Sequence, residues 1–217
     1  MGVLSMDNEI SLTDMAYEHL ERMIIFEELR GGAMYSEKQL AERLDMGRTP
    51  VREALQKLAW EQMVVIHPRR GIQIPEVSVE NQLKLLEVRR PIEAACVELA
   101  AQRATSGQKK RMLALAEGIL VCSDNNDDET FLTYLRDIHH LLVEAARNEY
   151  FIKAMSPLQG LSRRFWFLNK ELDTGHPANL HADIMRTVAA GDRQNAREAS
   201  DALISYLTQQ AKEKIGM

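Results

Sequence analysis

Cysteine and long apolar runs are scarce in this chain. Cys96 and Cys122 are the only cysteines among 217 residues, which is too few for a disulfide framework and lacks zinc-finger spacing. No apolar run approaches the roughly 18 residues of a membrane span, and no signal-peptide pattern is seen. We therefore expect a cytoplasmic protein that does not enter the membrane. Both thiols should be buried and free, with a redox switch as the alternative.

Signatures of catalysis are also lacking. There is no Ser/His/Asp order, no glycine-rich phosphate loop and no complete set of metal ligands. The net charge of −5 argues against a protein that coats nucleic acid nonspecifically. An apolar fraction of 45% provides ample core for one or two domains. We expect no enzyme, and keep a metabolite-binding enzyme built on the helical part as an alternative.

The segment 36–75 has the pattern of a winged helix-turn-helix. Ser36 and Gln39 form a capping box that begins one short helix. After a turn-like tripeptide, Thr49 is a suitable N-cap for a second helix and Pro50 suits its first position. Apolar residues then recur at i, i+3, i+4 and i+7 and must face a core: Val51, Ala54, Leu55 and Leu58.

The opposite face of this second helix is polar. Its residues are Arg48, Thr49, Arg52, Gln56 and Lys57. Arginine suits bidentate contact with guanine, and a helix whose N-terminal residues enter the major groove is how helix-turn-helix proteins dock. The pattern predicts a recognition helix, with a solvated basic surface as the alternative.

Two short strands, 64–66 and 72–74, follow the predicted recognition helix. Arg69, Arg70 and Gly71 lie at the tip between them, where basic residues could hold phosphates or enter the minor groove. From residue 38 to residue 70 the chain has seven Lys or Arg and four Asp or Glu. Positive charge is therefore local in a chain that is acidic overall, as a DNA-docking face requires.

The stretch SEKQLAERLDMGRTPVREALQKL resembles the DNA-binding domain of GntR-type bacterial transcription regulators, most strongly in RTPVREAL. The family's turn usually reads Gly-Val-Ser where this chain has Asp-Met-Gly, so a phosphate contact there is in doubt. The resemblance implies operator contacts from the early helix, the recognition helix and the wing tip: Lys38, Arg48, Thr49, Arg52, Arg69, Arg70 and Gly71, with Gln56 on the same face.

The rest of the chain shows helical periodicity and no strand alternation. Short connections favour an antiparallel bundle of about six helices, and this part resembles the FCD ligand-binding domain. The fold class is thus mainly α, with a winged helix-turn-helix domain at 1–77 and an all-helical effector-binding and dimerisation domain at 78–217. The expected helices are 79–104, 108–121, 128–147, 149–171, 178–190 and 193–214.

The FCD resemblance implies a metal site that this chain retains only in part. FCD domains often hold a divalent metal through an Asp, a His one turn later and two further His. His139 and His181 match two of these positions, whereas Leu135 and Leu203 replace the other two. Two imidazoles bind a metal weakly without other donors, so no tightly bound metal is expected; hydrogen-bonded core histidines are the alternative. Candidates to complete the shell are Asp137, His140 and His176.

Arginines are the other candidate effector ligands. The resemblance implies that Arg89 points into the cavity, where Glu93 could pair with it. Arg163 and Arg164 precede an aromatic cluster, and one of them could face the same cavity. A pocket arginine favours a carboxylate-bearing effector. The residues expected to contact the effector are Arg89, His139, Asn148, Arg163 and His181.

These features together predict a bacterial transcription regulator, a repressor by default. A homodimer would read an inverted-repeat operator, and a small carboxylate metabolite would act through its different affinities for two arrangements of the protein. The alternative is a regulator that senses acyl-CoA or fatty acids. Leu135 and Leu203 favour that alternative, because they make the cavity more apolar.

Overall fold

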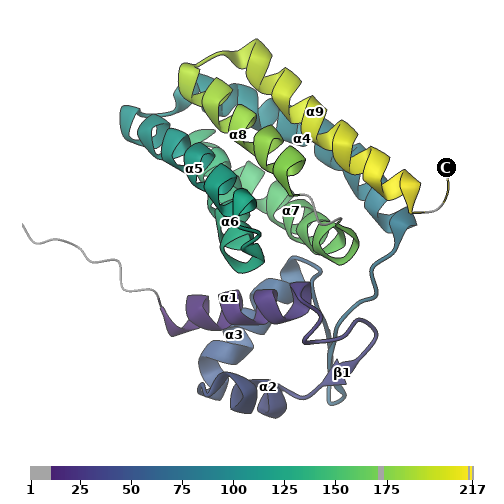
Figure 1. Ribbon diagram of the computed structural model, residues 1–217. Coiled ribbons are helices and arrows are strands. Elements are labelled where there is room, and N and C mark those ends of the chain that lie inside the picture. The colour runs from purple at the N-terminus through teal and green to yellow at the C-terminus, as the bar shows by residue number, and fades with distance from the viewer. Residues whose placement is uncertain (1–10, 171–173, 215, 217) are drawn as a thin grey trace, which may run out of the picture. The chain divides into compact units, whose positions relative to one another are not determined.

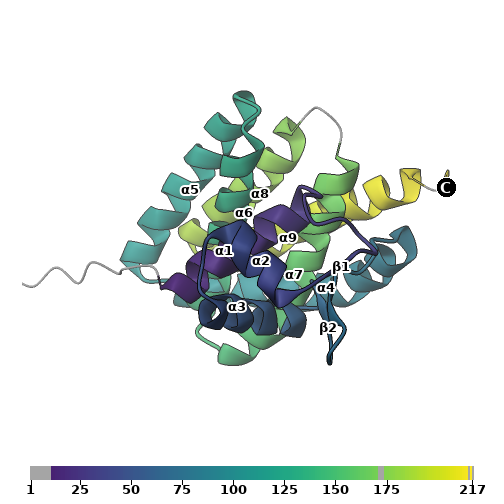
Figure 2. The ribbon, with the colours of Figure 1, turned by 90° about the horizontal axis from the view of Figure 1, so that it is seen from below.

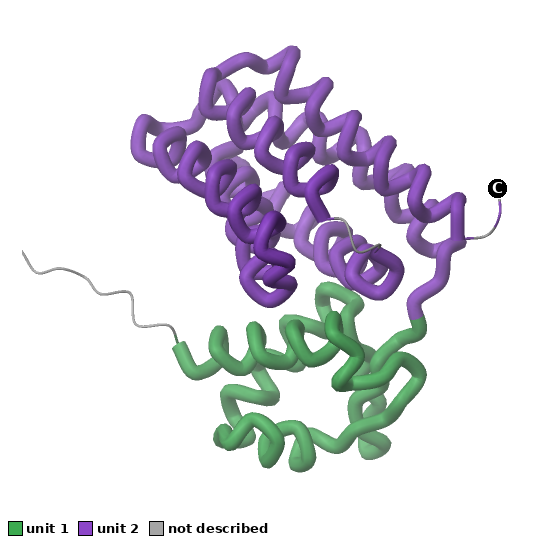
Figure 3. The backbone as a smooth tube through the Cα atoms, in the orientation of Figure 1, with its two compact units in different colours: residues 1–76 green, residues 77–217 purple. Residues whose placement is uncertain are grey.

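Helices form most of the structure. The computed structural model describes residues 11–170, 174–214 and 216, and the chain divides into two units, residues 1–76 and 77–217 (Figure 3). Within the described ranges (Figure 1) the helices are α1 (Leu12–Ile25), α2 (Glu37–Leu44), α3 (Arg48–Trp60), α4 (Val79–Arg103), α5 (Ser106–Asp124), α6 (Asp128–Ala145), α7 (Glu149–Asn169), α8 (Gly175–Ala190) and α9 (Arg193–Glu213). The strands are β1 (Met34–Tyr35), β2 (Val65–His67) and β3 (Gly71–Gln73).

The first unit packs α1 and α2 against α3. The apolar stripe predicted for α3 is buried, with side chains at most 2% exposed. The two predicted strands pair antiparallel, and β1 adds to the other edge of β3, giving the order β1-β3-β2. The strand β1 has only two residues and no alternation of its own, so its position depends on pairing with β3. The predicted winged helix-turn-helix fold is confirmed.

Capping side chains determine several of the helix boundaries. Ser36 and Gln39 form the predicted capping box of α2. Thr49 does not cap α3, because Asp45 turns the chain in a left-handed conformation (φ 51°) and the helix begins at Arg48, directly after Gly47. The prediction that Thr49 is the N-cap was wrong.

The second unit is the expected all-helical bundle of α4 to α9. The long helices α4 and α9 lie side by side, and α5 packs against α8 (Figure 1). Thr105 and Gln108 form a second capping box, so α5 begins two residues before its expected start. The predicted end of α7 at residue 171 lies outside the described residues. No helix in the described ranges is long and apolar enough to cross a membrane.

Candidate nucleic-acid interface and effector pocket

The polar face of α3 is exposed along its length. Arg48, Thr49, Arg52 and Gln56 all lie at the surface, because the apolar stripe on the other side is turned into the first unit. Arg52 is held by the carboxylate of Glu37 on α2: Nε donates to Oε2 and Nη2 to Oε1, each at 2.9 Å. The pKa of Glu37 lies below its ordinary value, first because Arg52 hydrogen-bonds its carboxylate. The sequence did not predict a role for Glu37, because its contact with Arg52 joins two helices and depends on how they pack.

Two lysines beside this face have different surroundings. Lys38 is exposed and lies 3.5 Å from the carboxylate of Glu42, one turn along α2. Lys57 lies 3.6 Å from the carboxylate of Asp14, with its ammonium 4.2 Å from the ring centroid of Tyr17. Lys57 therefore contacts α1, whereas Lys38 remains exposed at the surface of α2.

The β2–β3 hairpin forms the wing (Figure 2). Its register pairs Ile66 with Ile72 and His67 with Gly71, which leaves Arg69 and Arg70 exposed at the tip. Gly71 has φ +116°, and a Cβ at this position would lie 2.5 Å from the backbone oxygen of Tyr35. Glycine is therefore required here by both conformation and space.

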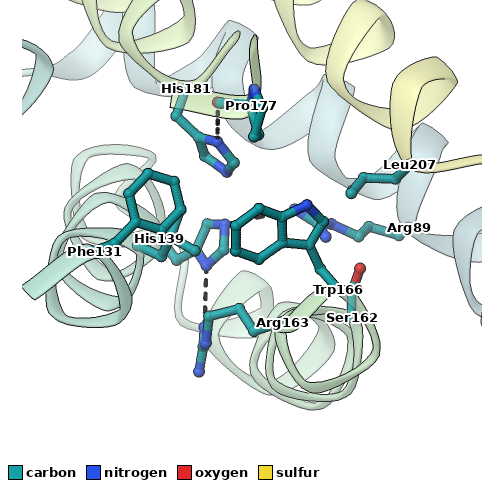
Figure 4. Close-up of a pocket in the computed structure, with 10 residues that line it drawn as sticks. Arg89, Phe131, His139, Ser162, Arg163, Trp166, Pro177, His181 and Leu207 are labelled. Atoms are coloured by element: carbon teal, nitrogen blue, oxygen red, sulfur yellow. Dashed lines mark hydrogen bonds between the residues drawn. The ribbon is translucent and has the colours of Figure 1, made fainter. Parts of the chain in front are cut away.

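A pocket in the second unit gathers side chains from α4, α6, α7, α8 and α9 (Figure 4). Its cavity volume is about 20 Å³, roughly enough for one water molecule. Polar and apolar groups both line it, including Arg89, Leu135, His139, Arg163, Trp166 and His181. Four of the five expected effector ligands thus lie in one pocket.

Both ring nitrogens of His139 face arginines. Nη1 of Arg163 donates to Nδ1 at 3.0 Å, and Nη2 of Arg89 lies 3.5 Å from Nε2. A guanidinium can only donate and a neutral imidazole has one acceptor nitrogen, so only one of these contacts can be a hydrogen bond; the shorter one, from Arg163, favours acceptance at Nδ1 and a proton on Nε2. Burial, followed by the charges of Arg89 and Arg163, holds the pKa of His139 well below its ordinary value.

His181 has the opposite tautomer. Its Nδ1 donates to the carbonyl oxygen of Pro177 at 2.8 Å, which leaves Nε2 as an acceptor. Burial lowers the pKa of His181 to about 4, against the opposing effect of the Pro177 hydrogen bond. The ring centroids of His139 and His181 are 5.7 Å apart.

A buried ion pair and an indole supply further polar groups. The Nε atom of Arg89 donates to Glu93 one turn along α4, and both side chains are 2% exposed. Oε1 of Glu93 and Nε1 of Trp166 are buried without a hydrogen-bond partner in the part of the chain that the structure describes. Trp166 is only 4% exposed and lines the pocket, so its N–H is a donor that a ligand could satisfy.

Several residues considered from the sequence lie elsewhere. Asn148 is the N-cap of α7, where its side chain accepts from the backbone N–H of Tyr150, and it does not line this pocket. Asp137 lies 4.0 Å from Arg111, outside the pocket.

The structure brings no further metal donors to the pocket. Leu203 is fully buried, whereas His140 and His176 are exposed. His176 packs edge-on against Tyr206. Across the described ranges, no group of three or more His, Cys, Asp or Glu side chains could hold a metal ion. The residues considered as additional ligands therefore do not complete a metal shell.

The fold and these two sites define a winged-helix protein with an all-helical domain around a buried polar pocket. Residues 12–74 match the family model of bacterial regulatory proteins of the gntR family, and residues 84–206 match the FCD domain. The chain belongs to the gntR family and carries an FCD domain. This agrees with the resemblance seen in its sequence.

Individual relatives agree with the family. The HTH-type transcriptional regulator McbR of Escherichia coli (strain K12) is 28% identical over 127 residues, which are 58% of this chain and 58% of McbR. The match thus spans less than two thirds of that relative. LutR, an HTH-type transcriptional regulator of Bacillus subtilis (strain 168), is 26% identical over 82% of this chain and 89% of its own. The solved structure of E. coli McbR/YncC has the same fold, with a TM-score of 0.77 and 19% identity over 95% of this chain and 99% of that one.

Proposed function

We propose that this protein is a sequence-specific DNA-binding transcription regulator, a repressor, whose DNA affinity is set by a small carboxylate effector. It acts in the cytoplasm as a homodimer on an inverted-repeat operator, because operator symmetry mirrors the symmetry of a dimeric protein. It is not an enzyme, in keeping with relatives that are named as transcriptional regulators.

The single observation that carries the DNA-binding role is the exposed polar face of α3 next to a basic hairpin. Arg48, Thr49, Arg52 and Gln56 provide groups for base edges and phosphates, and Arg69 and Arg70 provide positive charge on the wing. Lys38 adds a phosphate contact from α2. The net charge of −5 makes a general electrostatic attraction to DNA an inferior explanation.

Buried guanidinium groups support a carboxylate as the effector. Arg89 and Arg163 are 2% and 8% exposed and line the pocket with His139 and His181. A carboxylate gains strong charge-assisted hydrogen bonds in such surroundings. The cavity of about 20 Å³ is close to the size of one water molecule, so it has no room for an acyl-CoA chain, and a small acid requires the least rearrangement of the side chains that line it.

DNA selection tests the proposed function. The purified full-length protein is incubated with random duplexes at near-physiological salt, with and without small carboxylates, and bound sequences are read. We expect an enriched inverted repeat that Arg52→Ala loses, and release of that repeat by an acid. Thr133→Ala, on an exposed part of α6, serves as the matched control. A protein that enriches no sequence in any arm contradicts the proposal.

A further inference from the structure

The FCD resemblance implies a divalent metal, but the residues here do not fit one. Leu135 and Leu203 occupy two of the four positions where the family has metal ligands, and their side chains have no donor atoms. Of the two histidines, His139 has a guanidinium at each ring nitrogen, so a metal would have to displace an arginine to reach it. Of the ring nitrogens of these two histidines, only Nε2 of His181 keeps a lone pair for a metal, because Nδ1 of the same ring donates to Pro177. One imidazole among fixed positive charges is a poor cation site.

Arg163 also changes what His139 can do. By donating to Nδ1, it forces the proton onto Nε2 and makes that nitrogen a donor instead of a metal-binding acceptor. That N–H faces Nη2 of Arg89, which is itself a donor, at 3.5 Å. Two donors that face each other in a buried site leave both groups poorly satisfied. An anion between them would accept from both.

The indole of Trp166 independently points to a ligand. Its N–H is buried, lines the same pocket and has no partner among the described residues. Figure 4 shows the indole and the two imidazoles around the same space. A buried donor without an acceptor costs free energy that a bound acceptor recovers.

We propose that this pocket binds an anionic group of its effector without a metal ion. Arg89, the Nε2–H of His139 and the indole N–H of Trp166 are the donors, and Arg163 is the positioning residue that sets the His139 tautomer. Nε2 of His181 accepts from a hydroxyl or amino group on the same ligand. The inference rests on the proposed function, because it takes this pocket to be the effector site.

The tautomer of His139 is the first test, because it requires neither a ligand nor a variant. Long-range ¹H–¹⁵N NMR correlations distinguish Nδ1–H from Nε2–H rings in the full-length protein after EDTA dialysis. We expect His139 as the Nε2–H form and His181 as the Nδ1–H form. A His139 ring that carries its proton on Nδ1 overturns the inference.

Ligand-induced thermal stabilisation is the second test, with glycolate, acetate and the neutral glycolamide as probes. In EDTA, glycolate at ten times its Kd should raise the Tm of the helical unit by about 3–5 °C. Acetate should act more weakly, since it has no hydroxyl for His181, and glycolamide should not act. Adding Zn²⁺ or Mn²⁺ should not increase the glycolate shift.

Variants separate positioning from structural support. In Arg163→Leu, His139 should no longer be fixed in the Nε2–H form and glycolate should no longer raise the Tm. Arg163→Lys still has a donor at this position and should retain both properties. The Tm of each variant without ligand controls for folding of the second unit, and specific DNA binding controls for folding of the first. A glycolate response that needs metal and disappears in EDTA overturns this inference and leaves the proposed function standing. A protein that selects an operator but responds to no anion in either arm overturns the inference and the carboxylate assignment, while its DNA-binding role remains.

Discussion

Arg52 and Glu37 form a two-point ion pair between the predicted recognition helix and the preceding helix. Both hydrogen bonds are 2.9 Å long, and the arginine side chain is 61% exposed. Surface pairs of this kind contribute at most about 1 kcal/mol to folding, so orientation is the more important consequence. Glu37 fixes the plane of the guanidinium and leaves the Nη1 hydrogens and one Nη2 hydrogen outside the pair.

Substitutions of this pair should therefore affect operator recognition differently. Arg52→Ala should weaken binding to the selected operator by about 1–3 kcal/mol. Glu37→Gln should reduce the preference for that operator over a scrambled duplex, while binding to the scrambled duplex strengthens because a negative charge is lost near phosphates. Fluorescence anisotropy with both duplexes measures the two affinities. Equal changes on both duplexes would show that Glu37 does not orient Arg52.

A matched control comes from the second unit. Glu80 on α4 is an exposed carboxylate paired with Lys84 at 2.6 Å. Glu80→Gln makes the same chemical change as Glu37→Gln, but in the other unit. We expect its affinities for both duplexes to equal those of the wild type.

The wing arginines should act through charge. Arg69 and Arg70 are exposed at the hairpin tip, where they can neutralise phosphates whatever the base sequence. Each change to Ala should lower the slope of log K against log salt by about 1 and weaken operator and scrambled duplexes alike. Titrations between low and physiological salt measure the slope. An unchanged slope with a changed sequence preference would instead place these arginines on base edges.

The wing backbone gives a separate prediction about stability. Gly71→Ala places a Cβ near the oxygen of Tyr35 in a conformation that side chains rarely adopt, which should cost about 1–3 kcal/mol. Urea unfolding of the first unit measures the loss. Gly107→Ala is the control, because its Cβ would lie 3.9 Å from the nearest atom, Thr105 Oγ1. A Gly71→Ala protein as stable as that control would contradict the argument.

Local signals were sufficient to predict much of the fold. The capping box at Ser36 and the apolar spacing of α3 depend on neighbouring residues, so one sequence reveals them. Thr49 has the right chemistry for an N-cap. However, α2 ends at the left-handed residue Asp45, and α3 begins at Arg48, one residue before Thr49. The two-residue strand β1 has too little pattern of its own and was missed.

The pocket could be anticipated only in part. Arg89, His139, Arg163 and His181 come from four helices. Positions carried over from the family predicted that three of them lie together, whereas Arg163 was expected there because it precedes an aromatic cluster. Their hydrogen-bond partners could not be inferred in that way, because they depend on side-chain geometry across the bundle. The same applies to the indole N–H of Trp166. Asn148, also expected to contact the effector, is the N-cap of α7 and does not line the pocket with the other four residues.

The two cysteines should be unreactive in the folded protein. Both are buried and free. Burial and then Glu93 raise the pKa of Cys96 to about 12, and burial followed by two aspartates raises that of Cys122 to about 11. Since the thiolate is the reactive form, neither should react rapidly with a disulfide reagent at pH 8, and both should react in urea. Rapid labelling of the native protein would contradict this prediction and support the alternative of a redox switch at these cysteines.

Acid should destabilise the second unit through His181. Its pKa is about 4 in the folded protein and about 6.5 in an unfolded chain, so only the unfolded state binds this proton between those values. His181 alone therefore lowers the free energy of unfolding as pH falls from 6.5 to 4, by about 2 kcal/mol between pH 7 and pH 5. Two charged groups of its surroundings, Arg89 and Arg163, oppose protonation of His181, whereas the neighbouring His139 is itself neutral in this pH range.

Urea unfolding at pH 7 and pH 5 measures this loss in the wild type and in His181→Gln. The variant should lose about 2 kcal/mol less than the wild type on acidification, whatever its stability at pH 7. His140→Gln removes an exposed imidazole on α6 and should keep the wild-type acid sensitivity. If His181→Gln and His140→Gln respond equally to acid, His181 does not remain neutral in the fold. Its Nε2 would then not serve as the acceptor that the effector pocket requires.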